Sequence, residues 1–174
     1  MIIGVISDTH GTLPLKAAAA MAECDHIIHA GDICDPGILR ELRAYGPVTA
    51  VLGNNDYDEY GPDVRRFCKT TLGGLRFLVA HYPQDVEIGP FGNRAVSPGD
   101  PIPQVCVHGH THVPRILTGR DARPANLLLC PGSASRPRGG FPASVAKIVV
   151  EDGRVTDAWV ESLRDGTILM RMND

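Results

Sequence analysis

The chain has 174 residues, of which 43% are hydrophobic and 21% are charged. This composition excludes a largely disordered chain, and the length predicts one domain over residues 1–174. No apolar run approaches the roughly 20 residues of a membrane span, so we expect no membrane association. The formal net charge is −3, without the basic stripe that would indicate nucleic acid as a main partner.

The cysteines indicate the cellular compartment. There are five of them, at wide spacings and without a Cys-x-x-Cys pair. An odd, scattered set is typical of reduced thiols and not of a disulfide framework or a zinc finger. The chain also opens directly on a strand-like segment, without the basic region and cleavage site of a secretory signal. We therefore expect a cytoplasmic protein.

The first third of the chain alternates between strand-like and helix-like segments. Apolar and β-branched residues predict strands over 1–7, 25–30 and 47–52. Helices are predicted over 14–24, where a proline suits the first turn and an alanine run follows, and over 35–45, where apolar residues share one face. This βαβαβ order predicts a parallel sheet with right-handed crossovers.

The rest of the chain is richer in strands. These are predicted over 75–80, 104–107, 127–130, 144–150 and 155–163. The last two are joined by a good hairpin turn. Residues 82–103 hold five prolines and three glycines without a helical period, so a long loop is expected there. The pattern as a whole predicts two stacked sheets with helices outside.

Side chains that can bind a metal ion follow each of the first five strands. They are Asp8, His10, Asp32, Asn54, His81, His110 and His112. Because α/β sheets bind ligands at the carboxyl ends of their strands, we expect these donors to converge. Carboxylate, carboxamide and imidazole groups suit Mn²⁺, Fe or Zn²⁺ better than Ca²⁺, and the lack of thiolates argues against structural zinc. Seven donors are too many for one tetrahedral ion and suit two ions that share a bridging carboxylate.

Each of these pieces taken alone has an ordinary interpretation. Asp8 and His10 could belong to a capped turn, and Asn54 is a common turn residue. His29 and His108 are expected to be packed histidines with at most a supporting role at the site. The joint occurrence of donors at successive strand ends is what points to a metal centre.

The motif set resembles that of the calcineurin-like metallophosphoesterases, most closely the small single-domain phosphodiesterase branch of bacteria and archaea. The matching segments are Ser7-Asp8-Thr9-His10-Gly11, Ala30-Gly31-Asp32, Gly53-Asn54-Asn55-Asp56, His81 and Gly109-His110-Thr111-His112. The resemblance runs from residue 1 to about residue 138. It implies an α/β fold, a four-layer α/β/β/α sandwich of two mixed sheets flanked by helices.

The resemblance also implies a role for each donor. One ion would be held by Asp8, His10, Asp32 and His112, and the other by Asp32, Asn54, His81 and His110. Asp32 would bridge the two ions and, with Asn54 and His81, would act in catalysis, in which a hydroxide bridging the ions attacks phosphorus. Two divalent ions are implied, with Mn²⁺ expected first and Fe, Zn²⁺ or Ni²⁺ as alternatives. Asn55 and Arg136 are expected to contact the substrate.

Three features depart from the family pattern. Asn55 stands where many members have a histidine that serves as a general acid, and an amide cannot protonate a leaving group. Tyr82 stands where a glycine is usual, which predicts a narrower substrate mouth. The loop over 82–103 replaces an expected helix.

The function expected is hydrolysis of a small-molecule phosphate ester, most of all a phosphodiester. The alternatives are a phosphomonoesterase, or a nucleotide or phosphoprotein phosphatase on the same site. A non-catalytic scaffold of the same fold, like the retromer scaffold subunit, is a further alternative. A homodimer is the base-rate expectation for the assembly.

Overall fold

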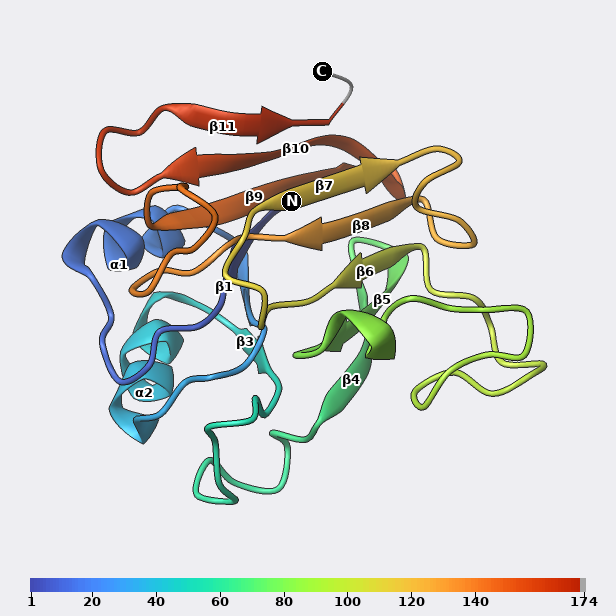
Figure 1. Cartoon of the computed structure of the whole chain (residues 1–174), viewed down its shortest axis with the longest axis horizontal. Helices are drawn as coiled ribbons and strands as arrows, with labels where there is room; N and C mark the ends of the chain where they lie inside the picture. Colours follow the sequence, from blue (N-terminus) through green and yellow to red (C-terminus); the bar gives the residue numbers. More distant parts are fainter. Residues whose placement is uncertain (173–174) are drawn as a thin grey trace.

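The computed structural model describes residues 1–172, so the last two residues of the expected domain lie outside the described part. Two β-sheets pack face to face, with helices beside one of them (Figure 1). Within residues 1–172, no helix has the length and apolar character needed to cross a membrane.

The first sheet has the order β11-β10-β9-β1-β2-β3. Its parallel half pairs Ile6 with His29 and His29 with Ala50, so the three N-terminal strands end at the same edge. The antiparallel half consists of β9, β10 and β11, and β9 joins it to the parallel half by pairing with β1. The strands are β1 (Ile2–Ile6), β2 (His26–His29), β3 (Val48–Ala50), β9 (Ser144–Glu151), β10 (Arg154–Ser162) and β11 (Ile168–Arg171).

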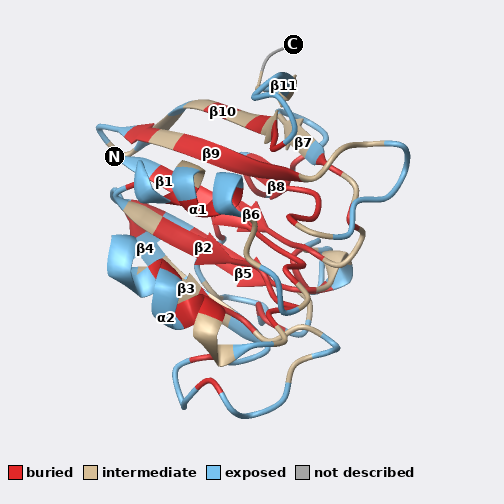
Figure 2. Ribbon diagram, turned by 90° about the vertical axis from the view of Figure 1, so that its left-hand side faces the viewer, coloured by how far each residue is buried: buried red, intermediate tan, exposed pale blue. Residues whose placement is uncertain are grey.

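Two helices cover the outer face of this sheet (Figure 2). They are α1 (Leu15–Ala22) and α2 (Pro36–Tyr45). The Asp35 side chain caps α2 by accepting a hydrogen bond from the Gly37 backbone N–H at 2.6 Å. The predicted βαβαβ unit is therefore confirmed, with both helices starting and ending within about two residues of expectation.

The second sheet has the order β4-β5-β6-β8-β7. Its three central strands are parallel, and an antiparallel strand lies at each edge. The strands are β4 (Phe67–Leu72), β5 (Leu75–Ala80), β6 (Val105–Val107), β7 (Arg115–Thr118) and β8 (Leu127–Cys130).

The main core lies between the two sheets, where side chains such as Val5, Phe77 and Val107 are buried. The α/β fold with two mixed sheets is confirmed. On the outer face of the second sheet, the covering layer consists of the 3₁₀ turn η1 (Pro83–Asp85) and the loop that follows it. Val86, Ala95 and Val96 from this segment pack on that face. The prediction of a long loop over 82–103 is thus confirmed, since η1 is the single helical turn found there.

Three strands were not predicted: β4, β7 and β11. Each lies at an edge of its sheet, and most of its positions are exposed or half-buried. An edge strand needs no continuous apolar run, so the usual sequence signal is weak.

Candidate metal centre

Loops that follow strands of both sheets meet at one edge and carry the predicted donors. The loop after β1 pairs with the loop after β2, because the Asp8 N–H donates to Gly31 O at 3.0 Å and the His10 N–H donates to Asp32 O at 2.9 Å. In the second sheet, the Gly109 N–H donates to His81 O at 3.1 Å. The loops therefore continue the strand pairing in an irregular form, which places their side chains in one region.

The backbone of these loops is strained. Asp8, His10, Asp32, His110 and His112 all have left-handed φ values, between 45° and 66°. Non-glycine residues rarely adopt this region, and when they do they cluster at functional sites. The strain is therefore concentrated in the residues that carry the donor atoms.

One group of donors lies around Asp8. Ligand atoms of Asp8, His10, Asp32 and His112 all lie within 4.8 Å of one another. Asp8 Oδ1 is 3.1 Å from His112 Nε2, which is 3.3 Å from His10 Nε2. His10 Nε2 is 3.8 Å from Asp32 Oδ2. These are the four residues predicted to share one ion.

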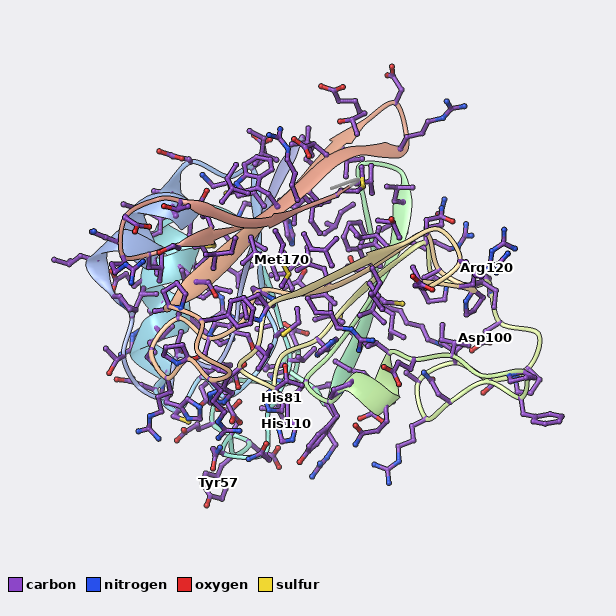
Figure 3. The ribbon with its side chains drawn as sticks, turned by 45° about the horizontal axis from the view of Figure 1, so that its top comes forward. Tyr57, His81, Asp100, His110, Arg120 and Met170 are labelled. Carbon is purple, nitrogen blue, oxygen red and sulfur yellow. The ribbon has the colours of Figure 1, made fainter. Side chains whose placement is uncertain are left out.

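The other predicted group lies on the far side of Asp32. Asp32 Oδ1 is 3.6 Å from His81 Nε2. Asn54 Oδ1 is 3.2 Å from His81 Nε2 and 3.0 Å from His110 Nδ1. His81 and His110 are neighbours (Figure 3), and their ring planes are inclined by 76° with centroids 5.1 Å apart. Asp32 thus presents one oxygen to each group, and all seven predicted donors come together.

The chemistry of the first group suits a divalent cation. Asp8 Oδ1 is buried and makes no hydrogen bond of good geometry with the described residues, although His112 Nε2 lies 3.1 Å away. The other oxygen of Asp8 is engaged, since it accepts from Ser7 Oγ at 2.6 Å and from the His110 N–H at 3.1 Å. A buried carboxylate oxygen facing imidazole nitrogens is stabilised by a metal ion, because an orphaned buried charge is otherwise costly.

Hydrogen bonds on the remote ring nitrogens set the histidine tautomers. His81 Nδ1 donates to Ala30 O at 2.8 Å, and His112 Nδ1 donates to Arg136 O. With Nδ1 protonated, Nε2 of each ring carries a lone pair directed at the cluster. His10 has the weaker partner Cys34, whose Sγ lies 3.9 Å from its Nδ1.

Electrostatics keep Asp8 and most of the imidazoles in the form that binds cations, whereas contact with Asp8 raises the pKa of His112. Burial raises the pKa of Asp8, but the adjacent His112, the hydrogen bond from Ser7 and the nearby His81 outweigh it, so the net shift is downward. Burial lowers the pKa of His10 and of His110. Asp8 is therefore ionised and these two imidazoles are neutral at pH 7, as metal coordination requires.

Two buried histidines near the site predict a pH dependence of stability. Burial lowers the pKa of both His29 and His108 to about 4. As the pH falls below about 6.5, the unfolded chain binds these two protons before the folded chain does, so the folded state loses stability. We expect metal-free protein to lose up to about 1.4 kcal/mol per pH unit for each histidine between about pH 6.5 and 4.

Urea unfolding of metal-free protein at about pH 7, 6 and 5 measures this slope. His112 offsets part of this loss of stability at low pH, because its proximity to Asp8 raises its pKa, which adds stability that is present at low pH and lost as the pH rises. The variant His108→Leu removes one titrating group, so its slope should be smaller. Equal stability at the three pH values would contradict the prediction.

Asp56 links the loop that carries Asp32 to the loop that carries Asn54. The sequence predicted no role for this residue. Its carboxylate accepts hydrogen bonds from the backbone N–H groups of Gly53, Ile33 and Cys34 at 2.7, 3.1 and 2.8 Å, and from Tyr60 Oη at 2.9 Å. It therefore ties the loop of Asp32 to the loop of Asn54. Its place at the end of the Gly53-Asn54-Asn55-Asp56 turn was the available signal, since aspartate in a turn accepts backbone N–H bonds.

Two serines, also missed, hold the loop of Asp8. Ser133 Oγ and Ser135 Oγ donate to Asp8 O at 2.8 and 3.0 Å, and Ser135 Oγ also lies 2.8 Å from Thr9 O. These contacts span more than 120 positions in the chain, so local sequence patterns give no sign of them.

Two glycines permit close packing around the carboxylates. A Cβ atom at position 109 would lie 2.0 Å from Ser7 Oγ, and one at position 53 would lie 2.1 Å from Asp32 Oδ1. Any side chain at either position would displace a carboxylate or its hydroxyl partner.

The two residues expected to contact the substrate lie at the exposed rim. Asn55 is exposed, and its backbone N–H and its Nδ2 donate to Asp32 Oδ1 and Oδ2 at 2.9 and 2.7 Å. The Arg136 side chain is exposed, while its carbonyl holds His112. Contact of either residue with substrate stays a prediction.

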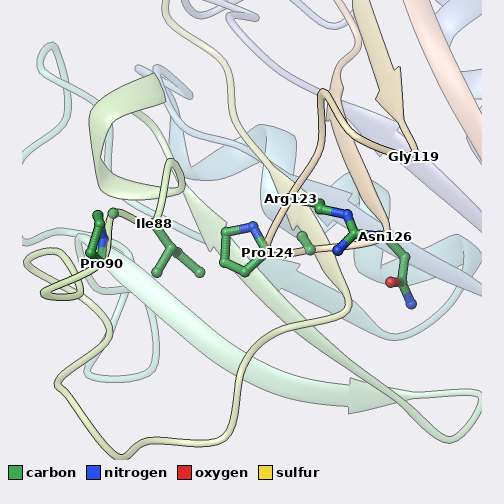
Figure 4. Close-up of a pocket in the computed structure, with 8 residues that line it drawn as sticks. Ile88, Pro90, Gly119, Arg123, Pro124 and Asn126 are labelled. Atoms are coloured by element: carbon green, nitrogen blue, oxygen red, sulfur yellow. The ribbon is translucent and has the colours of Figure 1, made fainter.

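A hollow elsewhere on the molecule is lined by residues of the segments 88–90 and 119–126. It has a volume of about 770 Å³ and contains none of the seven donors (Figure 4). Its lining includes Ile88, Pro90, Arg123 and Pro124. The Tyr82 ring instead borders the donor cluster, with its centroid 4.6 Å from that of His110. This contact agrees with the expectation that Tyr82 narrows the mouth of the site.

Two proteins from archaea are similar to this chain in sequence. A probable metallophosphoesterase of Methanothermobacter thermautotrophicus is 32% identical, covering 98% of this chain and 96% of the relative. A probable metallophosphoesterase of Methanocaldococcus jannaschii is 35% identical, covering 87% and 77%.

Three solved structures have the same fold. The phosphoesterase YfcE from E. coli is 24% identical with a TM-score of 0.71, covering 99% of this chain and 98% of that one. Vps29 from Entamoeba histolytica complexed with Zn²⁺ is 19% identical with a TM-score of 0.73, covering 99% and 98%. An archaeal phosphodiesterase is 23% identical with a TM-score of 0.65, covering 92% and 99%.

Residues 1–153 match the model of the calcineurin-like phosphoesterase superfamily domain. Two archaeal relatives above 30% identity and the converging donors agree with that match. The chain belongs to the calcineurin-like phosphoesterase superfamily.

Proposed function

We propose that the protein is a phosphodiesterase that uses two divalent metal ions, Mn²⁺ first among them. The observation that carries this proposal is the position of Asp32, which faces His10 with one carboxylate oxygen and His81 with the other, at 3.8 and 3.6 Å. A single carboxylate between two donor groups is the arrangement that a two-ion centre needs.

In this proposal Asp8, His10, Asp32 and His112 hold one ion, and Asp32, Asn54, His81 and His110 hold the other. When bound at these residues, the ions would supply Lewis-acid chemistry for the hydrolysis of a phosphate ester. The buried members of the site, Asp8, Asp32, His81 and His112, exclude bulk water on the inner side. We propose that residues 1–174 act as one domain, because β9 to β11 extend the sheet that carries Asp8 and Asp32.

The chain's own polar groups would orient the substrate at the exposed rim. The side chains of Asn54 and Asn55 are exposed there, next to the half-buried His10 and His110. Arg136 is exposed beside the same rim and acts electrostatically on His10. A guanidinium at this place can bind a non-reacting phosphate oxygen. The similarity to an archaeal phosphodiesterase supports the choice of a diester as substrate.

A scaffold is the second candidate, because structures of Vps29 share the fold. One of them is complexed with Zn²⁺, so metal binding alone does not separate a scaffold from an enzyme. Hydrolysis does separate them. The convergence of all seven donors in this chain favours the enzyme.

Metal removal and replacement test the proposal. We expect purified protein to hold about two divalent ions per chain and to hydrolyse bis(p-nitrophenyl) phosphate. EDTA should abolish hydrolysis, and added Mn²⁺ should restore it. The monoester p-nitrophenyl phosphate should be hydrolysed more slowly than the diester. Folded, Mn²⁺-loaded protein that hydrolyses no ester would support the scaffold, and faster monoester hydrolysis would favour a phosphomonoesterase.

A further inference from the structure

Thr9 and His29 lie behind the metal centre and connect the loops that carry its ligands. Both residues are fully buried, at 0% exposure. Thr9 stands between Asp8 and His10 in the chain, and its Oγ1 lies 3.0 Å from His29 Nε2. No step of the proposed reaction uses either side chain, so a buried hydroxyl and a buried imidazole remain to be explained.

The hydrogen bonds of this pair form a series in which each group donates to the next, from Gly31 to Ile33. The Gly31 backbone N–H donates to His29 Nδ1 at 3.3 Å, so Nδ1 is an acceptor and the neutral ring carries its proton on Nε2. His29 Nε2–H then donates to Thr9 Oγ1, and the Thr9 hydroxyl donates to Ile33 O at 3.1 Å. The series begins at Gly31 and ends at Ile33, the two neighbours of Asp32.

This arrangement holds both loops in their strained form. Asp8, His10 and Asp32 have φ values of 54°, 45° and 54°, which need support from the surrounding structure. Backbone bonds from His10 N to Asp32 O and from Gly11 N to Ile33 O, at 2.9 and 2.8 Å, join the same loops. Thr9 and His29 add the side-chain part of this connection on its buried side.

We propose that Thr9 and His29 are positioning residues that keep Asp32 and His10 within reach of the same cation. The proposal rests on the proposed function, because it assumes that these two residues bind a metal ion. Groups that orient metal ligands from behind typically change metal affinity by 10- to 100-fold when they are removed.

The substitution Thr9→Val tests the proposal, since it removes the hydroxyl at nearly constant volume. Mn²⁺ alone is the probe, and its dissociation constant is measured by titration calorimetry on metal-free protein. We expect Thr9→Val to weaken Mn²⁺ binding by about 10- to 100-fold. Thr9→Ser, which keeps the hydroxyl, should bind Mn²⁺ like the unmodified protein.

A matched control exists on the same strand. His26 Nε2 and Thr49 Oγ1 form another histidine–threonine hydrogen bond of 2.8 Å, at the opposite end of β2. Thr49→Val should lower the melting temperature without changing the affinity for Mn²⁺. If Thr9→Val also lowered only the melting temperature, the pair would be structural and the inference would be overturned, while the proposed function would stand.

The histidine tautomer is a second test that needs no substitution. In metal-free protein, ¹⁵N NMR should find His29 neutral with its proton on Nε2 and protected from exchange. A proton on Nδ1 would reverse the direction of the series and overturn the inference even if Thr9→Val failed to fold. Unmodified protein that bound no Mn²⁺ or other divalent ion would instead refute the proposed function together with this role.

Discussion

Replacing Asp32 by asparagine is expected to abolish both metal binding and hydrolysis. Asp32 is 2% exposed, and each of its carboxylate oxygens faces a different donor group. The amide is neutral and has one oxygen, so it lacks the negative charge and cannot present an oxygen to each donor group. Losing the several kcal/mol of charge stabilisation that metal ions supply corresponds to a decrease in kcat/KM on the order of 1,000-fold. Metal content and kcat/KM for bis(p-nitrophenyl) phosphate measure the two effects.

Asp35→Asn is the matched control for this substitution. Asp35 lies three positions further along the same loop, is exposed, and caps α2. Asparagine caps helices about as well as aspartate, so fold, metal content and activity should be retained. An Asp32→Asn protein that kept two ions and more than about a tenth of the activity would refute the bridging role.

Introducing a general acid at position 55 is expected to extend the range of substrates. Asn55 holds no proton that it can transfer, so hydrolysis should depend on good leaving groups. Asn55→His should raise kcat for a dinucleoside monophosphate, whose leaving group is an alkoxide, by about 100-fold. The rate with p-nitrophenyl diesters should change little, because p-nitrophenolate leaves without protonation.

The substitution at Asn55 needs controls because this side chain also contacts Asp32. Its Nδ2 donates to Asp32 Oδ2, so the substitution also removes a contact to the proposed bridging ligand. Asn55→Gln keeps an amide and supplies no acid, and it should show no gain with the alkoxide substrate. Metal content measured for both variants separates a change in Asp32 from a change in proton transfer. Unchanged kinetics in Asn55→His would refute the interpretation that an acid is missing.

Most of the site could be predicted because its residues follow strongly apolar strands. Asp8, Asp32 and His81 each come directly after, or within two or three residues of, a buried strand, and parallel strands bring such ends to a common edge. The donors are carboxylate, carboxamide and imidazole groups, and their joint occurrence at successive strand ends indicates a metal centre. The left-handed backbone at Asp8 and Asp32 could not be predicted, because it depends on hydrogen bonds between loops distant in the sequence.

The parts that escaped prediction depend on long-range contacts. β4, β7 and β11 are edge strands, whose exposed face removes the apolar run that marks a strand. Ser133 and Ser135 support Asp8 across the whole domain, and Asp56 supports the loop of Asp32 from a turn that follows another strand. Serines occur throughout the chain, and nothing local distinguishes Ser133 and Ser135 as the ones that hold a backbone carbonyl in the folded protein.

The left-handed backbone of the donor residues bears on how such a chain could change in evolution. Histidine is poorly suited to the conformation found at positions 10, 110 and 112, whereas glycine and asparagine adopt it at low energetic cost. A lineage that no longer needed hydrolysis could therefore gain folding stability by exchanging these histidines, since selection for activity would no longer oppose the change. Descendants that act only by binding other proteins would drift toward glycine and asparagine at these positions first, while the buried sheets kept their sequence.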